Sequence, residues 1–595
     1  MPAPTAATIL ERAGERPHPR LVFTAEREAA LKQRLTTDPL AQDLVDGLRQ
    51  GAELILTETV CERIQTGRRL LFVSRMVLKR VLLLAMVYRL EGDQRFLDRA
   101  RDEMLAAAAF SDWNPSHWLD VAEMSMALAF GYDWLFHHLS AADRATIRQA
   151  LNTHGINNYQ PLRRTNNWND VCNGSMIVTA LALTEDDPGG FEPLLAPALN
   201  AWPIALNHYG DGTHPEGPSW YWGYATMFSC LTFAALDSAA DTDCDLLAAY
   251  PGFLRSAYYY LHMHGPTGLQ FNYSDAGSGT AGAAPQQFWF AERNNDSDLH
   301  LLELARLRSD LAAGTACRNR IAPFALLWLP EQRDAKPPQA LSYCGTGPAA
   351  VSTHRQSWTD PASAFLGCKA GTPQASHAHL DLGSFVYERF GQRWAIDLGA
   401  QEYDSLEQAG VSLWDKKPGA QRWDVFRLGA AAHSVLMING ANPQVEATAR
   451  FLRHGSGFSI IDLSESYPEL TAATRGLRLL ADGSLLIQDQ ITVGTSDVTL
   501  RWAMTTPADL RLADDAHHAV LRLGQHSLQI HSAGPAVTWA VFATNPPPQP
   551  YDVANPGTAQ IGFTTTLAAG SRHRLTVHLR APSEAPAVIT DLDSW

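Results

Sequence analysis

Two histidines separated by a single residue, His377 and His379, mark a segment whose side chains could bind a metal or take part in catalysis. On a β-strand, alternate side chains face the same side, so the two imidazoles are predicted to point together. Asp397 and His433 follow and complete a set of mixed nitrogen and oxygen donors that is typical of a Zn²⁺ site. The alternative is that each histidine is separately hydrogen-bonded, because histidine serves many other roles in proteins.

A second segment, residues 211–224 (DGTHPEGPSWYWGY), joins a Gly- and Pro-rich loop to four aromatic residues. Trp220, Tyr221, Trp222 and Tyr224 fall where a helix is expected to begin. Aromatic faces stack on pyranose rings, so the segment suits a sugar-binding lip. The same rings suit a protein core equally well, and the residue types leave both interpretations open.

A third segment is rich in asparagine, which occupies four of the eight positions from 166 to 173. Amide groups there can face a carboxylate and donate hydrogen bonds to it. Asparagine is also a common helix N-cap and turn former, and an apolar run follows at 176–183. The segment is therefore either a capping loop or a set of donors for an acidic ligand.

The first 330 residues or so have the periodicity of helices. Residues 21–35 are charged and amphipathic, 75–90 have apolar residues at helical spacing with Gly92 beyond their end, and 116–135 have Ser116 as a candidate N-cap. Ser140 precedes a further helix. Other helical stretches are expected near 174–184, 219–239, 242–264 and 298–313. Stacked helical hairpins of this kind, closed into a ring, predict an (α/α) toroid over residues 1–335.

Strand-like patterns take over after residue 330. Residues 331–350 are rich in Pro, Gly and charge, which fits a linker. Alternating patterns then recur between turn residues, at 383–388, 434–438, 485–491, 498–502 and 575–579. Many short strands predict an antiparallel β-sandwich over residues 336–595. The fold class is thus multidomain, with a helical part followed by a β part.

Length and charge narrow the function classes. A chain of 595 residues is too long for one core, because single cores stop growing at roughly 250–300 residues. The net charge of −15 disfavours a nucleic-acid binder, which needs a basic face, but a local basic cleft can still hold an acidic sugar. Seven cysteines without a CxxC pair predict buried free thiols rather than a disulfide framework. Oligomeric state is not readable.

Targeting signals are not evident. The segment that begins the chain lacks a basic region followed by an apolar one, which predicts a cytoplasmic protein if this N-terminus is native and a periplasmic or secreted one if a leader was removed. The longest strongly apolar stretch, residues 81–88, is far short of the ~20 residues that a membrane helix needs. No membrane partner is expected.

Four segments together resemble the heparinase II/III-type polysaccharide lyases. They are WNPSHWLDVAEM at 113–124, NNWN at 166–169, the Glu-Gly-Pro-Ser-x-Tyr loop at 216–221, and SHAHLDLGSF with WAIDLG at 376–399. They occur in the family's order and span most of the chain. The resemblance implies an (α/α) toroid with a C-terminal β-sandwich, and an enzyme that cleaves a uronate-containing polysaccharide such as a glycosaminoglycan or alginate.

The resemblance also implies roles for single residues. Asn167 matches the amide that contacts the uronate carboxylate, Tyr221 the catalytic tyrosine, and His377 the active-site histidine. His379, Asp397 and His433 match the ligands of a structural zinc. The substrate-binding candidates around these positions are Asn166, Trp168, Arg163, Arg164, Glu216, Trp220, Tyr224 and His117.

Two positions depart from the family pattern. Trp168 stands where several relatives have histidine, and Phe426 is the aromatic residue near the place of a second sandwich tyrosine in alginate-cleaving relatives. Both departures leave the identity of the uronic acid open. The first favours a mechanism in which one tyrosine serves as both base and acid.

β-Elimination sets clear requirements for the site. The enzyme must neutralise the uronate carboxylate, take the C5 proton and protonate the oxygen that leaves C4. Asn167 and His377 are the expected donors to the carboxylate, while Tyr221 needs a positive neighbour because an ordinary tyrosine has a pKa of about 10. Arg163 and Arg164 either add positive charge or form a solvated pair. Since Asn167 and Tyr221 fall in the helical part and His377 in the strand part, a cleft between two domains is expected.

Two other functions remain open at this point. A glycoside hydrolase on the same scaffold would use paired carboxylates, for which Asp211, Glu216 and Asp275 are candidates. A sugar-binding protein without catalysis would keep the aromatic residues alone. Ultraviolet absorbance distinguishes a lyase, because only its product contains a C4–C5 double bond.

Overall fold

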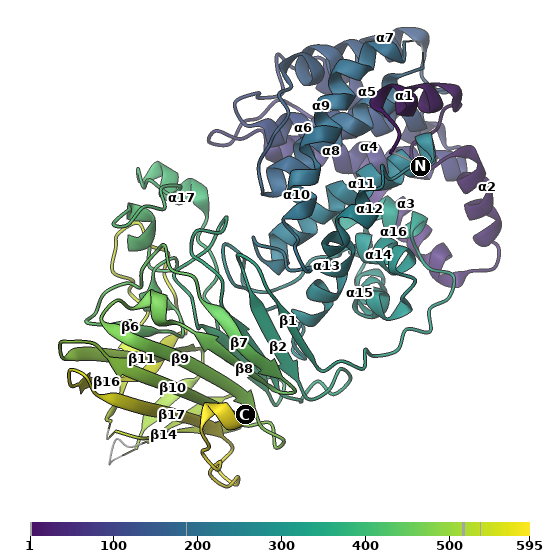
Figure 1. Cartoon of the computed structure of the whole chain (residues 1–595). Helices are drawn as coiled ribbons and strands as arrows, with labels where there is room; N and C mark the ends of the chain where they lie inside the picture. The colour runs from purple at the N-terminus through teal and green to yellow at the C-terminus, as the bar shows by residue number, and fades with distance from the viewer. Residues whose placement is uncertain (1–2, 186, 514–517, 536) are drawn as a thin grey trace. The chain divides into compact units, whose positions relative to one another are not determined.

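The computed structural model describes residues 3–185, 187–513, 518–535 and 537–595, and it divides the chain into two compact units (Figure 1). The first unit comprises Met1–Tyr209, Gly223–Ala257 and Gly282–Lys336. The second comprises Gly210–Trp222, Tyr258–Ala281 and Pro337–Trp595. Two segments from the helical part of the sequence, 210–222 and 258–281, therefore belong to the unit that contains the sheets.

The first unit is built from helices. They are α1 (Ala6–Glu15), α2 (Ala25–Arg34), α3 (Pro39–Thr57), α4 (Leu71–Glu91), α5 (Gln94–Ala108), α6 (Trp118–Trp134), α7 (Ala141–Ala150), α8 (Asn167–Leu183), α9 (Glu192–Ala201), α10 (Pro203–Asn207), α11 (Gly223–Ala240), α12 (Leu246–Ala249), the first part of α13 (Pro251–His262), α14 (Gln286–Asn294), α15 (Leu301–Ala312) and α16 (Ala322–Leu327). Helices α4, α6, α8, α11, α14 and α16 pack in that order, and α16 returns to α4. This closed ring confirms the predicted toroid.

Local signals explain several helix ends. Gly92 ends α4 in the left-handed conformation, at φ 76°, where a side chain would be strained. Ser140 caps α7 by accepting a hydrogen bond from the backbone N–H of Asp143. Ser116 does not cap α6: His117 holds that position, and the Ser116 hydroxyl donates to Asn114 instead. The prediction of Ser116 as N-cap is therefore wrong.

The second unit consists of three antiparallel sheets. One contains β1 (Ser342–Gly345), β2 (Val351–Arg355), β3 (Phe365–Lys369), β4 (Phe385–Arg389) and β5 (Gln392–Ala395). An eight-stranded sheet has the order β12-β13-β14-β17-β10-β9-β8-β7, and a four-stranded sheet the order β15-β16-β11-β6. Their strands are β6 (Leu436–Ile438), β7 (Arg450–Gly455), β8 (Phe458–Asp462), β9 (Leu470–Leu479), β10 (Leu485–Val493), β11 (Val498–Thr506), β12 (Asp509–Leu512), β13 (His518–Leu523), β14 (His526–Ala533), β15 (Trp539–Ala543), β16 (Ala559–Leu567) and β17 (Arg572–Arg580).

Side chains from all three sheets share one core. Trp394 on β5, Ile487 on β10 and Trp502 on β11 are fully buried members of it. The five predicted strand segments fall on β4, β6, β10, β11 and β17. The helical first unit and the antiparallel second unit confirm the predicted fold class. Among the described residues, no helix is long and apolar enough to cross a membrane.

All seven cysteines are free thiols, and the prediction that they are also buried holds for four of them. Cys61, Cys172, Cys230 and Cys368 are buried, and the other three are partly exposed. Burial raises the pKa of the Cys61, Cys172, Cys230 and Cys368 thiols, which keeps them protonated.

Candidate active site and metal centre

Tyr221 lies in a short π-helical turn, Pro218–Trp222, in the second unit. Its neighbour Trp222 is fully buried and stacks on Tyr260, with ring centroids 4.0 Å apart, and so anchors the segment. Trp220 points the other way and is 51% exposed. Gly217, at φ 100°, lets the loop pass close to the backbone oxygen of Tyr273, which a Cβ would meet at 2.9 Å. The aromatic segment is thus partly core and partly open surface.

His377 lies on a loop, not on a strand as predicted from its spacing to His379. Residues 374–384 form turns, and His377 adopts φ 59°, a left-handed conformation that is uncommon for a residue with a side chain. The ring is held from both sides: Nδ1 lies 2.8 Å from Asp275 Oδ2, and Nε2 lies 3.2 Å from Glu216 Oε1. Burial alone would lower the pKa of His377, but the hydrogen bonds and charges of these two carboxylates raise it to about 9. His377 is therefore an imidazolium at neutral pH.

The Tyr221 ring stacks on this imidazolium, with centroids 4.2 Å apart and planes 21° from parallel. Its hydroxyl lies 2.6 Å from the hydroxyl of Tyr403. The Tyr403 hydroxyl in turn donates to Asp275 Oδ2 at 2.8 Å and lies 3.0 Å from His377 Nδ1. A continuous hydrogen-bonded path therefore runs from Tyr221 through Tyr403 to Asp275.

The surroundings of Tyr221 and Tyr403 keep both hydroxyls protonated. Burial and the charge on Asp275 hold the pKa of Tyr221 well above its usual value, and the same two causes raise that of Tyr403. Both hydroxyls are therefore proton donors in the resting protein. The positive group that Tyr221 was expected to need is present as the stacked His377 ring.

Asp275 is the charged centre of the group. It is fully buried, and its oxygens serve His377, His379 and Tyr403. Burial favours the neutral acid, but the nearby Arg422 guanidinium, 3.5 Å away, and the two histidines outweigh it and hold the pKa of Asp275 well below its usual value. Asp275 is thus a fixed buried anion.

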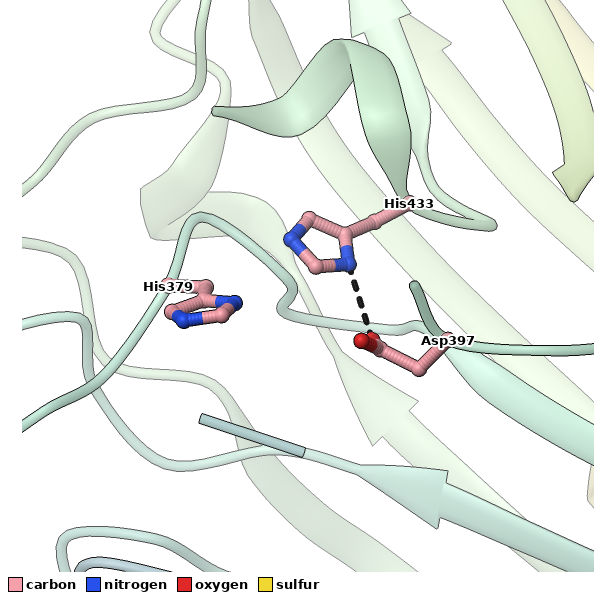
Figure 2. A group of neighbouring side chains, drawn as sticks. All are labelled: His379, Asp397 and His433. Carbon is pink, nitrogen blue, oxygen red and sulfur yellow. Dashed lines mark hydrogen bonds and ion pairs between the residues drawn. The ribbon is translucent and has the colours of Figure 1, made fainter. Parts of the chain in front are cut away.

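The three predicted zinc ligands come together in the second unit (Figure 2). His379 lies on the 374–384 loop, Asp397 follows β5, and His433 precedes β6. One potential ligand atom from each lies within 4.8 Å of the others, and all three side chains are buried. His433 Nδ1 is 2.9 Å from Asp397 Oδ2.

The hydrogen bonding of the two histidines fits a metal. Nδ1 of His379 and Nε2 of His433 are buried and have no hydrogen-bond partner among the described residues. An unsatisfied buried nitrogen costs stability unless a ligand uses it. The other nitrogen of His379 is held by Asp275 at 2.9 Å, which is the carboxylate support that metal-binding histidines commonly have. The donor set of two imidazoles and one carboxylate suits Zn²⁺.

The asparagine-rich stretch lies within α8 in the first unit, not in a loop before it. Asn169 donates to the backbone oxygens of Arg164 and Ala201, and Asn173 hydrogen-bonds both the N–H and the C=O of Leu162. These two amides fasten the preceding loop to the helix. Asn167 is buried in the first turn, and Asn166 precedes it with a buried Oδ1 that has no partner among the described residues.

The other predicted substrate-binding residues of the first unit have structural contacts. His117 Nδ1 lies 2.7 Å from Asp120, and its ring meets Trp168 edge-on at 5.1 Å. The Arg164 guanidinium lies over the Trp168 ring, 5.1 Å from its centroid. Arg163 is exposed. In the second unit, Glu216 is fully buried and accepts a hydrogen bond from Ser376 as well as facing His377.

Sequence reasoning missed three members of the site. Tyr403, rather than Phe426, supplies the second tyrosine hydroxyl, and Arg422 supports Asp275. Trp414 is 46% exposed and meets the rings of Tyr403 and His377 edge-on, at 5.0 and 5.6 Å. The available signal for Tyr403 was its position six residues after Asp397, a candidate metal ligand.

Comparisons with known proteins agree with this architecture. Residues 353–569 match the family model described as heparinase II/III-like, C-terminal. No curated protein matches the chain. The solved structure of a heparinase III, the BT4657 gene product, is similar with a TM-score of 0.58 at 12% identity, over 97% of this chain and 93% of that one. Heparan sulfate lyase HepC from Pedobacter heparinus gives 0.58 at 14% identity, over 97% and 88%. These similarities show a shared fold.

Proposed function

We propose that this chain, which belongs to the heparinase II/III-like family through residues 353–569 and has the fold of heparinase III, is a polysaccharide lyase. The proposed substrate is a uronate-containing polysaccharide, such as a glycosaminoglycan, and the proposed reaction is β-elimination. The observation that carries this proposal is the hydroxyl of Tyr221, stacked on a charged imidazole and joined through Tyr403 to a buried carboxylate.

The proposed reaction moves one proton from carbon to oxygen. The C5–H bond breaks, its electron pair forms the C4–C5 double bond, and the C4–O bond breaks with its electrons on oxygen. In our assignment, Tyr221 first loses its hydroxyl proton to solvent, and its phenolate oxygen then takes the C5 proton. Tyr221 gives this proton to the leaving oxygen and is again a phenolate, while Asp275 stays ionised. Proton transfer by positioned groups is worth roughly 10²–10⁴-fold in rate.

The high pKa of Tyr221 makes this phenolate a minor form of the resting protein, because burial and the charges of Asp275 and Glu216 disfavour it. The charge of the nearby Arg422 favours it. The His377 imidazolium beneath its ring then stabilises the negative charge that develops on the oxygen.

Two further roles come from the family resemblance. Asn167 is the proposed donor to the uronate carboxylate. The exposed rings of Trp220 and Trp414 are proposed to stack on sugar rings, because aromatic faces pack well on pyranoses. The preference among uronic acids is part of the same proposal, with glycosaminoglycans favoured over alginate by the heparinase-like fold.

His379, Asp397 and His433 would hold the proposed zinc. Its contribution there is structural: it would fix the loop that carries His377 by joining it to the segments after β5 and before β6. The chain's own residues then do the proton chemistry. His379 keeps Asp275 in place from the metal side, through the hydrogen bond at its Nε2.

A glycosidase mechanism fits these carboxylates less well. It requires one carboxylic acid that gives a proton and a second carboxylate that attacks or activates water. Asp275 is held ionised and is occupied by two histidines and a tyrosine, while Glu216 is buried against His377 and Ser376. Asp211 accepts hydrogen bonds from Thr346.

A panel of polysaccharides tests the proposal. Heparan sulfate, hyaluronan, chondroitin, alginate, glucuronan and ulvan would each be incubated with the protein, and ultraviolet absorbance followed. We expect absorbance to rise with at least one of them as C4–C5 double bonds form. Binding without any cleavage would instead support a sugar-binding protein, and new chain ends without absorbance would support a hydrolase.

A further inference from the structure

A group of charged residues lies inside the helical ring of the first unit. Glu123 on α6 is fully buried, and Arg75 on α4 donates from Nε to its Oε1 at 2.9 Å. Arg320, just before α16, places Nε 2.9 Å from the other oxygen of Glu123. Tyr224 on α11 donates its hydroxyl to Oε1 at 2.7 Å. We call these four residues the arginine pair cluster.

The cluster lies across the ring rather than along its wall. In the ring order, α8 separates α6 from α11, yet the hydroxyl of Tyr224 reaches Glu123. The two guanidinium groups lie 4.9 and 5.0 Å from the centroid of the Tyr224 ring. Arg75, Glu123 and Tyr224 are all in the N-terminal part of their helices. The cluster therefore lies at one end of the ring, where the helix dipoles favour negative charge.

A second Arg–Glu–Arg group in the same unit shows what a purely structural version looks like. Arg80 and Arg99 both bind the buried Glu103, and they also donate to the backbone oxygens of Glu58 and Thr59. The Glu58 carboxylate pairs with Arg80 as well. Two guanidiniums are thus balanced by two carboxylates, and their side chains are only 7% and 9% exposed.

The arginine pair cluster lacks this balance. Two guanidiniums share the single carboxylate of Glu123, so one positive charge is left over. The side chains of Arg75 and Arg320 are 39% and 22% exposed. Among the described residues, no carboxylate or carbonyl oxygen accepts from the Nη atoms of Arg75 or from Nη1 of Arg320. The cluster therefore offers N–H donors that meet no carboxylate or carbonyl oxygen among the described residues.

We propose that Arg75 and Arg320 bind an anionic group of the polysaccharide, either a carboxylate or a sulfate ester. This inference rests on the proposed lyase function. It assigns the enzyme's requirement for an acidic sugar to Arg75 and Arg320. Arginine suits the role because its planar fork of donors matches an oxyanion with two parallel hydrogen bonds. Glu123 and Tyr224 act as positioning residues, because they hold the forks in place without using their outer nitrogens.

The first experiment measures anion binding without turnover. Thermal unfolding of the whole protein would be followed with increasing glucuronate, with increasing sodium sulfate, and with sodium chloride at matched ionic strength. A ligand that binds the folded state raises the melting temperature by mass action. We expect glucuronate, sulfate or both to raise it beyond chloride. A response to glucuronate alone assigns the site to a carboxylate. Because sulfate also stabilises folded proteins by exclusion from their surface, only a response to sulfate that Arg75→Gln and Arg320→Gln reduce assigns the site to a sulfate ester.

Variants then locate the binding. We expect Arg75→Gln and Arg320→Gln each to raise the dissociation constant about tenfold or more, because each removes charge-assisted hydrogen bonds. Arg293→Gln is the matched control: it removes one charge from a similarly exposed arginine, 32% exposed and paired with Asp237, elsewhere in the unit. Arg75→Lys keeps the charge and removes the fork, so it should recover part of the affinity.

The outcomes separate this inference from the proposed function. If the wild type responds to neither anion beyond chloride, or if both Arg→Gln variants bind as tightly as Arg293→Gln, the cluster is structural and the inference is wrong. Lyase activity could still be present in that case. On whichever polysaccharide is cleaved, we expect the Arg→Gln variants to raise KM more than they lower kcat, and an unchanged KM would also contradict the inference.

Discussion

Two fully buried carboxylates, one in each unit, behave in opposite ways. Asp275 in the second unit is surrounded by Arg422, His377 and His379, and its pKa is held well below the usual value. Glu303 in the first unit accepts one hydrogen bond, from the backbone N–H of Ala284, and its nearest cation, Arg306, is 3.7 Å away. Burial raises the pKa of Glu303 to about 7, although the Arg306 charge opposes this.

The difference shows that partners, and not depth of burial, decide whether a buried acid is charged. In the second unit, two histidines, an arginine and a tyrosine surround Asp275 and stabilise its charge. Buried charges that are not paired cost several kcal/mol, so such an arrangement is expected where the charge has a task. The proposed task is to keep His377 charged beneath Tyr221 and to hold His379 and Tyr403 in place by hydrogen bonds.

The largest effect is expected for Tyr221→Phe. This variant keeps the ring that stacks on His377 and removes only the hydroxyl. We expect turnover to fall by at least ~10²–10⁴-fold, with melting temperature and metal content unchanged. Steady-state kinetics on the cleaved polysaccharide would measure the loss.

Tyr259→Phe is the matched control. Its hydroxyl lies 2.6 Å from that of Tyr273, the same distance as in the Tyr221–Tyr403 pair, but among the described residues no imidazole stacks on its ring. We expect this variant to remain active. Full activity in Tyr221→Phe would end the tyrosine assignment.

Removal of the Asp275 charge should affect reaction and metal together. Asp275→Asn breaks a buried ionic group, which typically costs about 3–5 kcal/mol, and it deprives His379 of its anchor. Loss of such support commonly lowers metal affinity 10–100-fold. Unfolding in denaturant, metal analysis and kinetics would each be measured.

Asp489→Asn is the matched control for Asp275→Asn. Asp489 is buried in the same unit and paired with Arg475 at 2.7 and 3.1 Å, and no hydrogen bond among the described residues joins its carboxylate to a histidine. A similar loss of stability with intact activity and metal binding is expected there. Equal activity losses in both variants would mean that Asp275 acts only through the fold.

The third effect concerns the metal alone. We expect about one zinc ion per chain, and we expect chelation to lower the melting temperature of the wild type, because a bound metal stabilises the folded state. His433→Ala should lose the ion and no longer respond to the chelator. His354→Ala, which removes a buried histidine bonded to Ser459 and Ser342, should keep both the ion and the response. A protein that binds no zinc and melts identically after chelation would refute the site.

The smallest effect is expected at Glu303. Its folded pKa, about 7, lies above the ordinary value of 4.5, so the folded state binds more protons than the unfolded state between these two pH values. Stability is therefore lost as pH rises through this window. Glu303→Gln removes the loss, and it should be on the order of 1–3 kcal/mol more stable than the wild type at pH 8 but not at pH 5. A pH-independent difference in unfolding free energy would contradict the assigned pKa.

The sequence was sufficient for most of the elements and for the grouping of the three candidate metal ligands. Helical and strand periodicities are local, and signals such as Gly92 and Ser140 fix helix ends without tertiary information. His379, Asp397 and His433 converge as the family resemblance implied. The assignment of segments 210–222 and 258–281 to the unit with the sheets had no local signal, because it depends on long-range packing.

The candidate active site also could be predicted only in part. Tyr221 and His377 could be predicted from motifs, but Tyr403 and Arg422 meet Asp275 only through tertiary contacts. The alternation rule failed at His377, since the local chain turns with a positive φ instead of extending as a strand. Residue type also could not show that Trp222 is a core residue while Trp220, two positions away, is exposed.

The most direct test of the central claim is where the oxygen of the product comes from. The cleaved polysaccharide would be digested in oxygen-18 water and the fragments weighed by mass spectrometry. Elimination adds no water, so we predict fragments without the heavy isotope, one of them unsaturated and ultraviolet-absorbing, and no fragments from Tyr221→Phe. Hydrolysis places one solvent oxygen in a product, so fragments that carry oxygen-18 and lack the double bond would contradict the account.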